Sequence, residues 1–65
     1  MDEKKKLSVV VEHWIEHNES HMNEYRRWAE KAAELGLAPV KAGIEEGIEK
    51  LLQCNQHLQK ALKAL

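Results

Sequence analysis

Three histidines recur every four residues in the first half of the chain, at His13, His17 and His21. Residues four apart on an α-helix lie one turn apart on the same face, so this spacing predicts a column of imidazoles. Imidazole nitrogens are common protein ligands of zinc, nickel, copper and cobalt. The spacing therefore makes a transition-metal site one hypothesis for this segment, provided that the segment is helical.

The second half of the chain offers two further metal ligands three residues apart, a thiol and a fourth imidazole. A turn centred between Leu37 and Ala38 places position 54 opposite position 21, and position 57 opposite position 18. Three nitrogens and one sulfur make a tetrahedral set suited to zinc, and an imidazole-rich set also suits nickel. The predicted metal ligands are His17, His21, Cys54 and His57, with His13 as an auxiliary ligand.

The same residues also permit a reading without metal, as a polar layer inside a helical bundle. His17, His21 and Asn55 would then hydrogen-bond across the helix pair and fix its register, as single buried polar residues do in coiled coils. A third hypothesis is a pH-responsive assembly, because neighbouring imidazoles repel one another once protonated. Under the metal hypothesis, Glu16 and Glu24 are further ligands or hydrogen-bond acceptors for bound imidazoles.

The elements that must position these residues are two helices joined by Gly36-Leu37-Ala38-Pro39. Glycine just past a helix takes the left-handed conformation without a Cβ penalty, and proline suits the first turn of the next helix. We expect one domain over residues 1–65, with helices over about 3–35 and 39–64 and a turn over 36–38. So short a turn makes the helices antiparallel, which predicts an all-α hairpin.

The apolar pattern indicates how the helices pair. The second helix carries a pattern with alternate spacings of four and three, at Ile44, Ile48, Leu51, Asn55, Leu58, Leu62 and Leu65. In the first helix we expect the seam on the face of Leu7, Val10, Val11, Trp14, Tyr25, Trp28, Ala32 and Leu35, with Ile15 and Met22 outside it. Each helix then keeps a second apolar strip, and so short a chain rarely builds a sufficient core alone. We therefore expect a homodimer that forms a four-helix bundle.

Composition excludes several classes of protein. A net charge of −1, from 10 basic and 11 acidic residues, argues against a nucleic-acid partner. No apolar run approaches the roughly 20 residues of a membrane helix, and the run after Lys4-Lys5-Lys6 is too short for a signal peptide. One cysteine cannot form an internal disulfide, so we expect a cytoplasmic protein with a free thiol.

No catalytic signature accompanies the histidines. The motifs H-E-x-x-H and E-x-x-H are missing, and no phosphate-binding loop or nucleophile–base pair can be identified, so we do not expect an enzyme. The first functional hypothesis is a small metal-binding protein for storage, sensing or chaperoning. The alternative is a structural or adaptor bundle that binds a protein partner.

Residues 12–25 contain the pattern H-W-x-x-H-N-x-x-H, followed by a Trp-Ala-Glu-Lys-Ala run and a Leu-Gly-Leu turn. In these features the chain resembles short, functionally uncharacterised histidine-rich helical-hairpin domains of bacteria and archaea. The resemblance covers nearly all of the chain. It implies an all-α fold and metal handling, and it assigns no catalytic residue.

Overall fold

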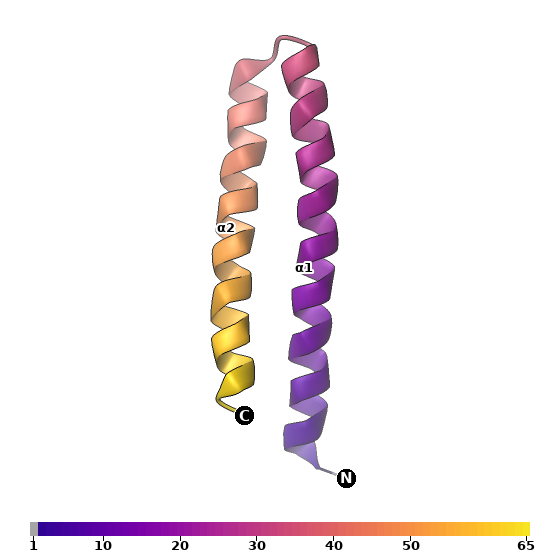
Figure 1. Ribbon diagram of the computed structural model, residues 1–65, viewed down its shortest axis with the longest axis vertical. Coiled ribbons are helices and arrows are strands. Elements are labelled where there is room, and N and C mark those ends of the chain that lie inside the picture. Colours follow the sequence, from indigo (N-terminus) through magenta and orange to yellow (C-terminus); the bar gives the residue numbers. More distant parts are fainter. Residues whose placement is uncertain (1) are drawn as a thin grey trace.

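Two long antiparallel helices make up the computed structural model, which describes residues 2–65 (Figure 1). Helix α1 spans Glu3–Glu34 and helix α2 spans Ala38–Lys63. Both chain ends lie at the same end of the hairpin, where α1 extends beyond α2 (Figure 1). The molecule measures 53 × 15 × 10 Å. The predicted all-α helical hairpin is confirmed, and the helix bounds differ by at most one residue from those expected.

The turn forms as the glycine and proline signals predict. Gly36 has a φ of +74°, in the left-handed region that favours glycine. Its N–H donates to the Ala33 carbonyl at 3.0 Å, and the Leu37 N–H donates to the Ala32 carbonyl at 2.9 Å. This pair of hydrogen bonds is a Schellman motif, which satisfies carbonyls that the helix end leaves free. Pro39 then lies in the first turn of α2.

A single seam of side chains holds the two helices together. Helix α2 contributes half-buried Ile44, Ile48, Leu51, Leu58 and Leu62, together with buried Asn55, as predicted. The buried apolar residues of α1 are Val11, Ile15, Met22, Ala29 and Ala32. Within residues 2–65 every ion pair joins residues of the same helix, on exposed side chains, so these pairs contribute little to helix pairing.

The predicted seam face of α1 is wrong in part: Val11 and Ala32 are buried as expected, but other members are not. Ile15 and Met22 are 8% and 4% exposed, although the apolar pattern placed them outside the seam. Trp14 and Trp28, expected inside it, are 49% and 57% exposed. The physical reason is size, because packed helix axes lie only about 8–10 Å apart. Alanines near the turn and medium-sized residues beyond it fit that spacing, whereas two tryptophans do not.

No helix within residues 2–65 is long and apolar enough to span a membrane.

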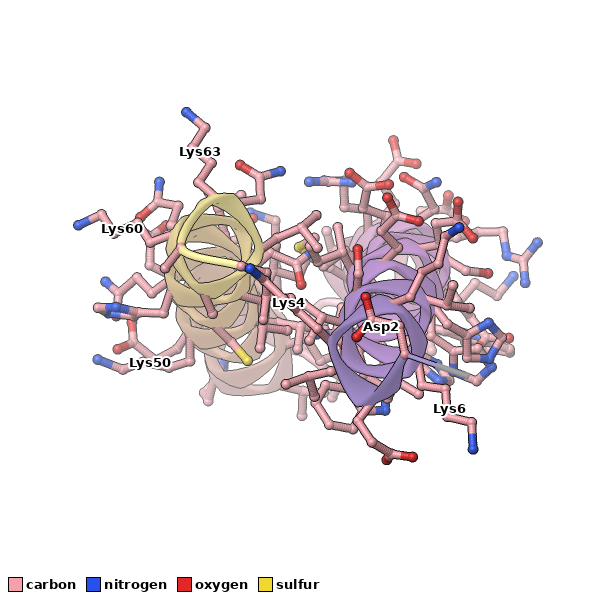
Figure 2. All side chains as sticks on the ribbon, turned by 90° about the horizontal axis from the view of Figure 1, so that it is seen from below. Asp2, Lys4, Lys6, Lys50, Lys60 and Lys63 are labelled. Atoms are coloured by element: carbon pink, nitrogen blue, oxygen red, sulfur yellow. The ribbon has the colours of Figure 1, made fainter. Side chains whose placement is uncertain are left out.

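Basic side chains line the outer side of α2, where Lys50 and Lys60 project away from α1 (Figure 2). The seam is therefore confined to the facing sides of the two helices.

Candidate functional site

A pair of asparagines forms the polar layer of the seam. Asn18 Nδ2 donates to Asn55 Oδ1 at 2.8 Å, and Asn55 Nδ2 donates to the Ile15 carbonyl at 3.2 Å. Asn55 is only 5% exposed, so its amide depends on these partners. Within the described part of the chain, the side-chain hydrogen bonds between α1 and α2 all involve Asn18 or Asn55. The layer therefore fixes the register of the hairpin.

The expected polar layer was right about Asn55 and wrong about its partners. His17 and His21 are exposed and do not reach the seam. The expected pairing also placed position 57 opposite position 18, whereas Asn55 is the residue that contacts Asn18. The difference arises because the turn is centred on Gly36 and Leu37, one residue earlier than assumed.

The histidine column forms on the exposed side of α1. The ring centroids of His13 and His17 are 5.3 Å apart, and those of His17 and His21 are 5.2 Å apart. The ring of His21 then stacks on Tyr25 at 6.0 Å, with 23° between the ring planes. The spacing of four residues thus produces the continuous ladder of rings that the sequence predicts.

A groove beside the seam brings part of this column together with the thiol. It has a volume of about 460 Å³ and is lined by His13, Trp14, His17, Asn18, Cys54 and Leu58. Cys54 is a free, exposed cysteine whose Sγ accepts a long contact of 3.9 Å from Asn18 Nδ2. The groove therefore places two imidazoles from α1 near a thiol from α2.

The fourth predicted ligand, His57, is not in this groove. It lines a different one with Gln56, Gln59, Lys60 and Lys63. A step of three residues from Cys54 rotates the side chain by about 60° and carries it to the outer side of α2. Within residues 2–65, no three His, Cys, Asp or Glu side chains already stand in positions that would hold a metal ion. The predicted four-ligand set is thus not assembled in one hairpin.

The side of the hairpin that carries Cys54 also carries an aromatic face made of two heptad stripes. The first stripe runs along α1 and consists of Leu7, Trp14, His21, Trp28 and Leu35. The second runs along α2 and consists of Val40, Gly47, Cys54 and Ala61. Trp14 and Cys54 line one groove, which places the two stripes side by side. Large exposed residues on α1 therefore lie beside mostly small ones on α2.

The other side of the seam is charged. A groove there is lined by Arg26, Ala29, Glu30, Lys41, Glu45 and Ile48. Lys41 Nζ and Glu45 Oε2 form an ion pair at 2.9 Å in this region. The hairpin thus has one aromatic side and one charged side, with the seam between them.

The family model of a domain of unknown function, DUF8180, matches residues 7–65. The chain belongs to this family. A comparison with curated proteins found no match, and neither did a comparison with solved structures.

One functional residue of this DUF8180 hairpin, Asn18, was not among those predicted from the sequence. A signal for it was present, because Asn18 follows Ile15 by three residues and precedes Met22 by four. The spacing around Asn55 on the antiparallel α2 is the reverse, four residues after Leu51 and three before Leu58. Two asparagines at equivalent seam positions of antiparallel helices predict a cross-seam amide pair.

Proposed function

We propose that this chain is a helical interaction module that pairs with a second copy of itself through the aromatic face. The product is a homodimeric four-helix bundle. The observation that carries this proposal is the exposure of Trp14 and Trp28, at 49% and 57%, on one side of the hairpin. Large apolar side chains exposed on one side of a protein often mark interaction sites.

The accessible surface area of the hairpin supports association with a second copy. The hairpin exposes 5107 Å², whereas a folded monomer of 7.5 kDa exposes about 4250 Å². The excess of about 850 Å² is close to the roughly 800 Å² that each partner buries in a standard protein interface. Burial against one further copy would therefore bring the exposed area of each chain to that of an ordinary folded protein.

Shape also favours a second copy. In a twofold dimer the same patch appears on both chains and must be complementary to itself. Here each chain offers large side chains on α1 and small ones on α2. The indole of Trp28 from one copy can cover Gly47 of the other, and the reverse contact follows by symmetry. Gly47 has room for this, because a Cβ built on it meets no atom within 4 Å.

The aromatic face is uncharged around Trp14 and has a charged rim at Trp28. The groove at Trp14 has no lysine or arginine in its lining, whereas the groove on the opposite side holds Arg26, Glu30, Lys41 and Glu45. The groove at Trp28 is lined by Arg27, Glu30, Lys31 and Glu34. Charged residues are depleted at the cores of protein interfaces and aromatic residues are enriched there. We therefore place the dimer contact on the aromatic side.

Sedimentation equilibrium tests the proposal. The wild-type chain is expected to have twice the mass of one chain, and the double variant Trp14→Lys/Trp28→Lys the mass of one. Leu52→Lys is the matched control, because Leu52 is 41% exposed and lies off the aromatic face. This control should remain a dimer.

A second measurement needs no substitution. Tryptophan emission should shift to shorter wavelength as the wild-type concentration rises, because association removes both indoles from water. A wild-type chain that sediments as a monomer and shows no concentration-dependent shift would refute self-association. That result would favour a partner of different sequence.

A further inference from the structure

We propose that His13 and His17 chelate a divalent transition-metal ion, with zinc as the metal of best fit and the Cys54 thiolate as a third ligand from α2. This inference goes beyond self-association, because every protein ligand comes from a single hairpin. The fourth coordination position is left to water. On binding, the Cys54 thiol loses its proton to solvent and the sulfur forms a bond to the metal.

The spacing of the imidazoles suits two ligands of one metal ion. Zinc binds imidazole nitrogen at 2.0–2.1 Å, and two imidazoles on a tetrahedral ion have ring centroids about 5.2 Å apart. The His13 and His17 centroids are 5.3 Å apart. This spacing is compatible with two imidazole ligands on one tetrahedral ion, and a thiolate from Cys54 would make a donor set that suits zinc.

The lining of the groove distinguishes the His13–His17 pair from the His17–His21 pair. His17 and His21 are separated by 5.2 Å, so distance alone does not exclude them. Because both pairs share His17, only one of them binds at a time. The groove that contains Cys54 is lined by His13 and His17 but not by His21, whose ring stacks on Tyr25. Only the first pair can therefore gain a thiolate ligand from α2.

No positively charged side chain in the groove opposes a cation. No lysine or arginine lines the groove, and its volume of about 460 Å³ leaves room for an ion with bound water. The Cys54 thiol has only the long contact to Asn18, so its side chain can turn toward the imidazoles at little cost. His57 lies instead among Lys60 and Lys63, whose charges repel a cation. The ligand set therefore omits His57 and keeps His21 outside it.

Titration with zinc chloride, followed by calorimetry, tests the pair. The wild-type chain should bind one zinc ion per chain, and His13→Ala should weaken binding by at least about tenfold. His21→Ala and His57→Ala are the matched controls, because both remove an exposed imidazole outside the groove. Both controls should bind within about twofold of wild type. Circular dichroism of each variant checks that the exposed substitutions leave the helices intact.

Titration with cobalt chloride tests whether the Cys54 thiolate is the third ligand. Tetrahedral Co²⁺ bound to thiolate shows a sulfur-to-cobalt charge-transfer band, which the wild-type chain should display and Cys54→Ser should lose. A His13→Ala variant that binds zinc like wild type, or a His21→Ala variant that loses binding, would overturn the chelating pair. A wild-type cobalt complex without the sulfur band would overturn the role of Cys54. Sedimentation of the same samples separates these results from self-association, because binding is counted per chain.

Discussion

Replacing the two asparagines of the seam by leucine, singly and together, tests how the register of the hairpin is fixed. The variants are Asn18→Leu, Asn55→Leu and the double variant. A leucine approximates the branched shape of asparagine but offers no hydrogen-bonding group. The four proteins form a double-mutant cycle that isolates the energy of the contact between Asn18 Nδ2 and Asn55 Oδ1.

The expected change in unfolding free energy follows from the burial of Asn55. In Asn18→Leu the Oδ1 of Asn55 loses its partner at a position only 5% exposed, which costs about 1–3 kcal/mol. Asn55→Leu removes two hydrogen bonds, worth about 2 kcal/mol in total. Burying the new leucine returns about 1.5–3 kcal/mol, so this variant should lie near wild type. The double variant leaves neither amide unpaired and should be more stable than wild type by about 1–3 kcal/mol.

The assay is urea unfolding followed by circular dichroism at one fixed chain concentration, since the stability of a dimer depends on concentration. We expect a coupling energy of at least about 1 kcal/mol between the two positions. Additivity within about 0.5 kcal/mol would refute the argument that the two amides depend on each other. The double variant should also sediment as a mixture of species, because an all-aliphatic seam no longer specifies one register.

Three further predictions concern packing and backbone. Met22→Ala should lower the unfolding free energy by about 2 kcal/mol, because Met22 is 4% exposed, whereas Leu52→Ala at a 41% exposed position should cost less than about 1 kcal/mol, both measured by urea unfolding. Gly36→Ala should cost about 1–2 kcal/mol in the same assay, because alanine is strained at a φ of +74°, and an unchanged midpoint would contradict the role of the turn. Gly47→Ala should stabilise helix α2 by about 0.8–1 kcal/mol at dilutions that leave single hairpins. The same change should weaken the dimer measured by sedimentation if a partner tryptophan covers Gly47, and unchanged dimer affinity would count against that contact.

The glycine after α1 and the proline in the first turn of α2 are strong local signals, and they made the helix bounds and the antiparallel arrangement predictable. Gly36 and Pro39 act through backbone conformation, which depends on the residue type and its immediate neighbours. The α2 seam was predictable for a related reason, since six of its seven positions from Ile44 to Leu65 are aliphatic, whereas the second strip of that helix consists mostly of small residues.

Helix α1 carries two stripes at heptad spacing, and its sequence alone does not say which one faces α2. The tryptophan stripe is more hydrophobic, yet the stripe with Ile15, Asn18 and Met22 is the one that packs. Two features of the tertiary structure determine which stripe of α1 faces α2. One is the small distance between the helix axes, and the other is the need of buried Asn55 for an amide partner. Because this stripe packs against α2, the tryptophans face outward. The same packing places His13 and His17, but not His57, beside Cys54. The sequence alone determined the column of histidines, because a helix repeats every 3.6 residues, whereas the neighbours of that column depended on how two helices fit together.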